Sequence, residues 1–143
     1  MNAGDFAMNI LLTVTGVLLG LLVMLVAAHF LLIELGREVV VVRTQDSGGE
    51  WNETRLWIVD HDGNPWLHSA GEKWEQRFKT PGVRVELVRD GTTGVYLAYP
   101  DRSQHAEIDL ALRKKYGFAD RWVRLLAPCD DTVLPVRLER TGS

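Results

Sequence analysis

An uninterrupted apolar stretch near the N-terminus constrains this chain more than any other feature. Residues 6–33 contain no Asp, Glu, Lys or Arg. As an α-helix, residues 10–33 would extend about 36 Å, which exceeds the ~30 Å hydrocarbon thickness of a bilayer. The sequence therefore predicts a transmembrane helix over residues 8–34, followed after a short linker by one soluble domain over residues 37–140.

A cleaved signal peptide is the competing interpretation, because Val26-Ala27-Ala28 resembles a cleavage site. The segment before the apolar run contains Asp5 and neither Lys nor Arg, whereas signal peptides begin with a positively charged region. Apolar residues also continue beyond the site as far as Ile33. These two features favour an uncleaved membrane anchor, with the lipid bilayer as a partner.

Charge next to the span predicts its orientation. No Lys or Arg precedes it, whereas Arg37 and Arg43 follow it. The positive-inside rule then predicts a single-pass protein of the inner or plasma membrane whose C-terminal domain lies in the cytoplasm.

Within the span, Gly16 and Gly20 have the spacing that lets two helices pack closely. His29 is a candidate haem ligand across such a pair, and equally a neutral imidazole near the interface without a role.

Composition excludes several classes of function. The chain has 16 Lys and Arg against 19 Asp and Glu, a formal net charge of −3, so no nucleic-acid partner is predicted. A single cysteine, Cys129, excludes an internal disulfide and a cysteine-based zinc site, and no metal site is predicted. The Gly-rich dinucleotide fingerprint, the Walker loop and the His-Glu-x-x-His motif do not occur.

Short strands joined by hairpin turns dominate the soluble part. Strands are predicted over residues 38–44, 53–60, 65–69, 83–87, 94–99 and 133–139, and helices over residues 72–79, 103–116 and 119–126. Asp62-Gly63 and Asp90-Gly91 are hairpin-turn signals, Ser103 is a predicted N-cap, and Gly117 ends its helix. The four valines at 39–42 indicate a strand buried on both faces or pressed against a neighbour. This order favours a small closed or nearly closed antiparallel barrel over a doubly wound sheet.

Eight short motifs of this domain occur in a characteristic order. They are Val42-Arg43-Thr44, Asp46-Ser47-Gly48-Gly49, Glu53-Thr54-Arg55-Leu56-Trp57, Asp62-Gly63, Trp66-Leu67-His68-Ser69, Lys73-Trp74, Pro81-Gly82-Val83 and Tyr116-Gly117-Phe118-Ala119-Asp120-Arg121-Trp122. Their order and spacing resemble the split β-barrel flavin and deazaflavin proteins, above all the deazaflavin-dependent nitroreductase or quinone reductase branch. The resemblance implies a mainly-β, α+β fold, a six-stranded antiparallel split barrel with short helices. It also implies a homodimer that holds FMN or deazaflavin (F-420) outside the barrel and transfers hydride to a quinone or nitro compound.

Three polar residues are candidates for binding the phosphate of such a cofactor. Arg55 lies on a predicted strand, Ser69 at a strand end and Lys73 at a helix start, where anions are favoured. Each also has an ordinary interpretation, a surface charge for Arg55 and a plain turn and helix start for the other two. His68 and Ser69 alternate along a strand, so only one of them can face a given ligand.

Aromatic residues supply the remaining candidates. Trp57, Trp66 and Trp74 lie close together in the sequence and could form a flat apolar wall for the ring, or simply fill the barrel core. Tyr116 and Trp122 belong to the motif that, by the resemblance, lines the substrate side, and they are the candidate catalytic residues. Both also suit an ordinary contact between a helix and the barrel.

Two function classes follow. The first is a membrane-anchored oxidoreductase-like protein whose flavin or deazaflavin reduces a quinone or nitro compound. The second is a non-catalytic barrel that serves as a structural or interaction module and has lost its cofactor. The loop at 46–50 is acidic where the resembling family is basic, which favours the second class. His61 and His105 are predicted to be solvated.

Overall fold

Two compact units make up the computed structural model, Met1–Leu35 and Gly36–Ser143, and it describes residues 3–34, 37–46, 48–126 and 132–142. The first unit is one helix, α1 (Ala3–Glu34). Its segment Met8–Leu31 is long and apolar enough to cross a membrane, and none of that segment is buried. Cys129 lies outside the described residues.

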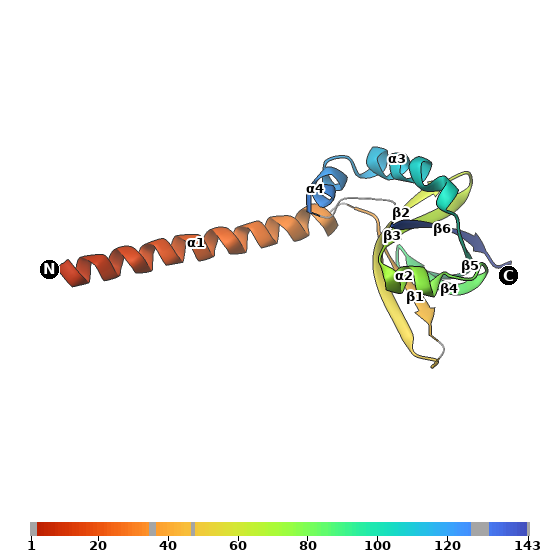
Figure 1. Cartoon of the computed structure of the whole chain (residues 1–143), viewed down its shortest axis with the longest axis horizontal. Coiled ribbons are helices and arrows are strands. Elements are labelled where there is room, and N and C mark those ends of the chain that lie inside the picture. The colour runs from red at the N-terminus through yellow and green to blue at the C-terminus, as the bar shows by residue number, and fades with distance from the viewer. Residues whose placement is uncertain (1–2, 35–36, 47, 127–131, 143) are drawn as a thin grey trace. The chain divides into compact units, whose positions relative to one another are not determined.

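Six antiparallel strands close the second unit into a barrel, with the order β1-β2-β3-β6-β5-β4 around the wall (Figure 1). The strands are β1 (Val39–Gln45), β2 (Trp51–His61), β3 (Asn64–Ala70), β4 (Val83–Arg89), β5 (Thr92–Pro100) and β6 (Val133–Arg140). Pairing of β1 with β4, in which Val41 lies opposite Val88, completes the closure. The predicted fold class, an apolar N-terminal helix followed by a six-stranded antiparallel barrel with short helices, is confirmed.

Hairpin turns hold the register of this barrel. Asp62 and Asp90 have φ of 50° and 49°, and the glycines that follow them have φ of 76° and 74°. Two successive residues with positive φ form the tight turn that matches the twist of paired strands, and Asp-Gly is suited to it. Both predicted hairpins are therefore present, β2 with β3 and β4 with β5.

The valine run of β1 is buried on one face. Val40 and Val42 are fully buried inside the barrel, whereas Val39 and Val41 are partly exposed. A strand in a barrel wall points alternate side chains inward, so only every second valine reaches the core. Burial on both faces, one of the two interpretations of this run, is wrong.

Four short helical segments connect the strands. They are α2 (Glu72–Arg77), the 3-10 turn η1 (Arg102–Gln104), α3 (His105–Tyr116) and α4 (Phe118–Leu126). The helix predicted from Ser103 begins two residues later, because the Asp101 carboxylate accepts the Ser103 N–H and caps the 3-10 turn instead. Gly117, with φ of 54°, ends α3 as predicted.

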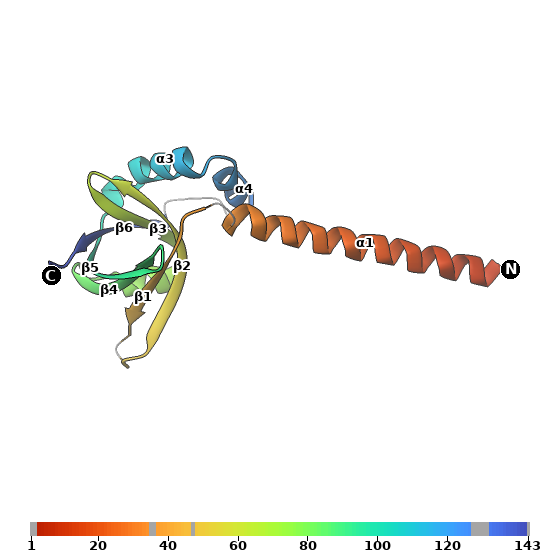
Figure 2. The same ribbon diagram turned by 180° about the vertical axis from the view of Figure 1, so that it is seen from behind.

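Two apolar clusters stabilise the second unit. The larger fills the barrel: Val40, Val42, Ile58, Leu67, Trp74, Phe78, Val85, Leu87, Ala98, Leu134, Val136 and Leu138. The smaller comprises Val59, Trp66, Ile108, Leu112 and Tyr116, and it lies between α3 and the outer faces of β2 and β3. Figures 1 and 2, seen from opposite sides, both show α3 along the outside of the barrel. Because α3 covers the outer faces of β2 and β3, a ligand can bind only at other parts of the barrel surface.

Candidate functional site

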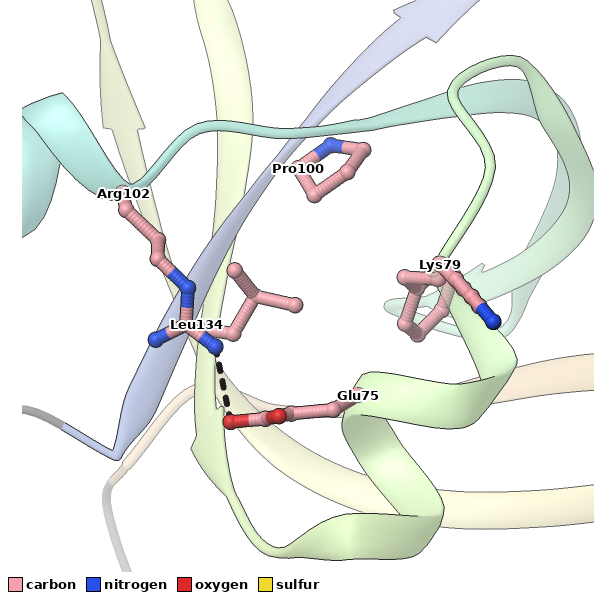
Figure 3. A pocket seen from close by; sticks show the side chains of 6 residues that line it. Glu75, Lys79, Pro100, Arg102 and Leu134 are labelled. Carbon is pink, nitrogen blue, oxygen red and sulfur yellow. Dashed lines mark hydrogen bonds and ion pairs between the residues drawn. The ribbon is translucent and has the colours of Figure 1, made fainter.

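A pocket of about 340 Å³ lies beside α2, and it is lined by Glu75, Phe78, Lys79, Pro100, Arg102 and Leu134. The floor is apolar, from Phe78, Pro100 and Leu134. Arg102 reaches over it to Glu75, with 2.8 Å between Nη2 and Oε1, and Lys79 lies across from Arg102 (Figure 3). Two cations and one carboxylate around an apolar floor form a site that suits a planar ligand with an acidic group.

Three of the predicted cofactor residues lie on β3 and α2, but none of them lines this pocket. Ser69 is the register partner of Leu134 across β3 and β6, and Lys73 is exposed on α2. Trp74 is buried in the barrel core, where its indole N–H donates to the Leu134 carbonyl at 3.0 Å. Its ring packs edge-on against Phe78, with 4.5 Å between ring centroids. Trp74 thus supports the pocket wall from inside and presents no face to a ligand outside the barrel.

The other predicted cofactor residues lie elsewhere. Arg55 is exposed on the outer face of β2, opposite Val41 in the register. Trp57, two residues along the same face, stacks on Tyr116 with 4.6 Å between ring centroids and 15° between planes. Trp66 is buried under α3. The three indoles therefore do not form one wall, because one is inside the barrel and two lie on its outside.

Tyr116 joins the end of α3 to the barrel. The residue is 2% exposed, and its hydroxyl accepts the Ile58 N–H at 3.1 Å. The hydroxyl also lies 2.7 Å from the Ile58 carbonyl and 2.9 Å from the Glu38 carbonyl, to which it can donate. Burial raises the pKa of this phenol above its ordinary value. Such a hydroxyl is placed to position α3, and it does not face solvent.

Replacing Tyr116 by Phe should lower the free energy of unfolding by about 1–3 kcal/mol, because a buried hydrogen-bonded hydroxyl is lost and its partners remain. The measurement is the midpoint of urea unfolding of the full chain in detergent micelles. Tyr99→Phe, at a partly exposed tyrosine, is the matched control and should change the midpoint little. Equal midpoints for Tyr116→Phe and the unchanged protein would show that the hydroxyl does not hold the helix.

Trp122, the second predicted catalytic residue, lies on α4 and is partly exposed. Helical spacing places it with Phe118 and Leu125, at i, i+4 and i+7, on a face that points away from α3. The pocket lining includes neither Trp122 nor Tyr116. The predicted residues thus lie apart from one another: Ser69, Lys73 and Trp74 on β3 and α2, Arg55 and Trp57 on the outer face of β2, Tyr116 at the end of α3, and Trp122 on α4.

A histidine pair was missed by the sequence analysis. His68 faces outward from β3, and its Nε2 lies 3.3 Å from Nδ1 of His105 on α3, with the two rings stacked. Burial, and then the nearby His105, lower the pKa of His68 to about 4. The prediction that His105 is solvated is wrong, because α3 carries it onto the barrel. Among the described residues, no group of three or more His, Cys, Asp or Glu could hold a metal ion.

A second pocket, of about 290 Å³, is lined by Gln45, Trp51, Val83, Arg84, Val85 and Glu86. It lies where β4 meets the β1–β2 hairpin, and the Trp51 side chain is exposed there. No sequence signal pointed to it, because its residues come from three separate strands.

No family model and no curated protein matches this sequence. Solved structures match it with low identity. A protein of unknown function from Agrobacterium tumefaciens, Atu2129, has a TM-score of 0.55 at 16% identity over 74% of this chain and 49% of that one, so the chain spans about half its length. A pyridoxinephosphate oxidase family protein from Clostridium acetobutylicum has a TM-score of 0.51 at 17% identity, covering 78% and 84% of the two chains.

A third solved structure, an FAD-binding protein from Mesorhizobium loti, has a TM-score of 0.50 at 13% identity, covering 77% of this chain and 86% of that one. Likeness at such identity is a statement about the fold. The second unit of this chain therefore has the split-barrel fold of flavin and pyridoxine-phosphate-oxidase-like proteins.

Proposed function

We propose that this chain is a membrane-anchored, oxidoreductase-like protein that binds a flavin or deazaflavin and passes hydride to a quinone or nitro compound. The observation that carries the proposal is the closed six-stranded barrel, similar to a protein named as FAD-binding, joined to a helix apolar enough to span a bilayer. In this proposal α1 crosses the inner or plasma membrane once, the barrel lies in the cytoplasm, and two copies form a dimer.

The pocket beside α2 has a residue set that suits such a cofactor. Its volume of about 340 Å³ is at the small end of the range for small-molecule sites, roughly 300–1,000 Å³. Arg102 would hold the phosphate, and Phe78, Pro100 and Leu134 would contact the apolar part. A bound phosphate would compete with Glu75 for Arg102. The cofactor, when bound, supplies the hydride chemistry, while this chain binds it and excludes water.

Chain length favours a lipid-soluble substrate. α1 ends at Glu34 and β1 begins at Val39, so the chain between them reaches at most about 18 Å. A barrel tethered so closely to a membrane helix stays near the bilayer surface, where quinones are concentrated. That closeness is the reason to prefer a quinone over a water-soluble acceptor.

The test is cofactor titration of the full chain purified in detergent, with FMN, FAD and F-420 added separately and absorbance and fluorescence recorded. Arg102→Ala should raise the Kd of the bound cofactor about tenfold, because one charge-assisted hydrogen bond is lost. Arg140→Ala, at an exposed arginine near the end of β6, is the control and should leave the Kd unchanged. If Arg55→Ala weakens binding instead, the cofactor binds on the outer face of β2. Failure of all three cofactors to bind contradicts the proposal.

A non-catalytic interaction module is the second candidate, and the packing of the aromatic residues favours it. Trp74 and Tyr116 are buried, and Trp57 stacks on Tyr116. The acidic loop is also folded on itself, because Asp46 Oδ1 accepts the N–H groups of Gly48 and Glu50 at 2.9 and 3.0 Å. Arg55→Ala with Lys73→Ala would then leave any bound chromophore unchanged and abolish capture of a protein partner.

A further inference from the structure

Helix α4 buries the Asp120 carboxylate and exposes its large apolar side chains. Asp120 is 5% exposed, whereas Phe118 is 58%, Leu125 is 74% and Leu126 is 61% exposed. The helix is strongly two-sided, with Phe118, Leu125 and Leu126 on one side and the Asp120–Arg124 ion pair turned toward α3. We call Phe118, Trp122, Leu125 and Leu126 the α4 apolar face. A solvated surface helix normally has the opposite arrangement.

The ion pairs under α4 fix this orientation. Arg124 contacts both Asp120 on its own helix and Asp109 on α3, each at 2.5 Å. Turning the apolar face inward would separate Arg124 from Asp109, whose side chain is 13% exposed, at a large cost in the interior, whereas the pair with Asp120 lies within α4 and would turn with the helix. The outward position of the apolar side chains is therefore built into the packing of α3 and α4, which Figure 1 shows as neighbouring helices.

The start of α4 lies where the chain enters the barrel. Tyr116, two residues before Phe118, lies with its hydroxyl 2.9 Å from the Glu38 carbonyl, and Lys115 forms an ion pair with the Glu38 carboxylate. Glu38 follows the last residue of α1, Glu34, by four positions, which span at most about 14 Å. The covalent chain thus limits how far the base of α4 can lie from the cytoplasmic end of α1.

We propose that the α4 apolar face rests in the interfacial layer of the same bilayer that α1 crosses, an inference that depends on the proposed membrane anchoring. Arg121 is exposed on α4 one helical turn before Leu125, and on α3 both Leu110 and Lys114, one turn apart, are exposed. Apolar side chains flanked by cations match an anionic lipid surface, with tryptophan at the level of the head groups. The barrel is then held at two points, which fixes its orientation on the membrane.

The test uses the full chain with Cys129→Ser, reconstituted in vesicles of phosphatidylcholine and phosphatidylglycerol. An environment-sensitive fluorophore is attached to Leu125→Cys, or to the control Thr80→Cys, an exposed position between α2 and β4. The label at 125 should emit at shorter wavelength than the label at 80, and spin-labelled lipid should quench only the label at 125. Arg121→Glu should weaken both effects in these vesicles.

Each other outcome overturns the inference. A blue-shifted label at 125 that spin-labelled lipid does not quench means that a second copy of the chain, and not lipid, covers α4. Equal emission and quenching at 125 and 80 means that the face stays in water. Alkaline carbonate extraction separates the two proposals: protein that stays with the vesicles but shows no quenching overturns only this inference, whereas protein released from them overturns the anchoring as well. Neither result depends on cofactor binding.

Discussion

Replacing Arg124 by Ala should detach helix α4 from α3. The substitution removes the cation between Asp120 and Asp109, whose side chains are 7% and 13% exposed. Burial alone would lower the pKa of Arg124, but its hydrogen bonds to Asp120 and Asp109 raise it, so the arginine stays charged at every relevant pH. Breaking a buried ion pair from one side typically costs about 3–5 kcal/mol, because an uncompensated charge remains. This is more than a nine-residue helix can withstand.

Hydrogen exchange of the backbone amides is the measurement. In Arg124→Ala, the amides of α4 should exchange about a hundredfold faster or more, while those of the barrel strands keep their protection. Arg113→Ala is the matched control, since Arg113 also pairs with Asp109, at 2.9 Å, but on the exposed side. In that variant, the free energy of opening that protects the α4 amides should change by less than about 1 kcal/mol. Unchanged protection of α4 in Arg124→Ala would mean that apolar contacts, not the ion pairs, hold the helix.

The barrel was predictable because its signals are local. Asp62-Gly63 and Asp90-Gly91 encode tight hairpins in two residues each, and the alternation after Val83 marks a strand regardless of the rest of the chain. The apolar run of α1 is likewise visible from composition alone. The start of α3 was placed two residues early because Asp101 and Ser103 are both good caps, and local sequence does not say which one the chain uses.

The candidate site was harder to predict, because it depends on which side of the barrel wall a residue faces. Strand alternation separates Ser69 from His68 but does not say which points inward. The outer faces of β2 and β3 are themselves apolar under α3, so Trp66 outside and Trp74 inside look alike in the sequence. Arg102 and Lys79 were overlooked because they line the pocket from two different segments of the chain.

Acidification should destabilise the second unit through His68. The pKa of this residue falls from 6.5 to about 4 on folding, first because of burial and then because of His105. Because folding lowers this pKa, between pH 6.5 and 4 the imidazole is protonated in the unfolded chain but neutral in the native protein. The contribution of neutral His68 to the free energy of unfolding is therefore fully present above pH 6.5 and is lost as the pH falls toward 4. The pKa change corresponds to at most about 3 kcal/mol. Asp109 and Asp120 oppose the effect and Arg124 adds to it, since all three face His68 from α3 and α4.

The measurement is the urea midpoint of the full chain in detergent between pH 7 and 4.5. The lower limit matters because Glu38 and Asp60, whose pKa values are lowered by their ion pairs with Lys115 and Arg89, add their own acid dependence below that pH. His68→Gln should remove most of the decrease in the urea midpoint between pH 7 and 4.5. The control His61→Gln, at a histidine that contacts Glu107 at 3.3 Å, should keep that decrease. If His68→Gln and the unchanged protein lose stability equally, the slope arises elsewhere. The contact between α3 and the barrel then does not require a neutral His68.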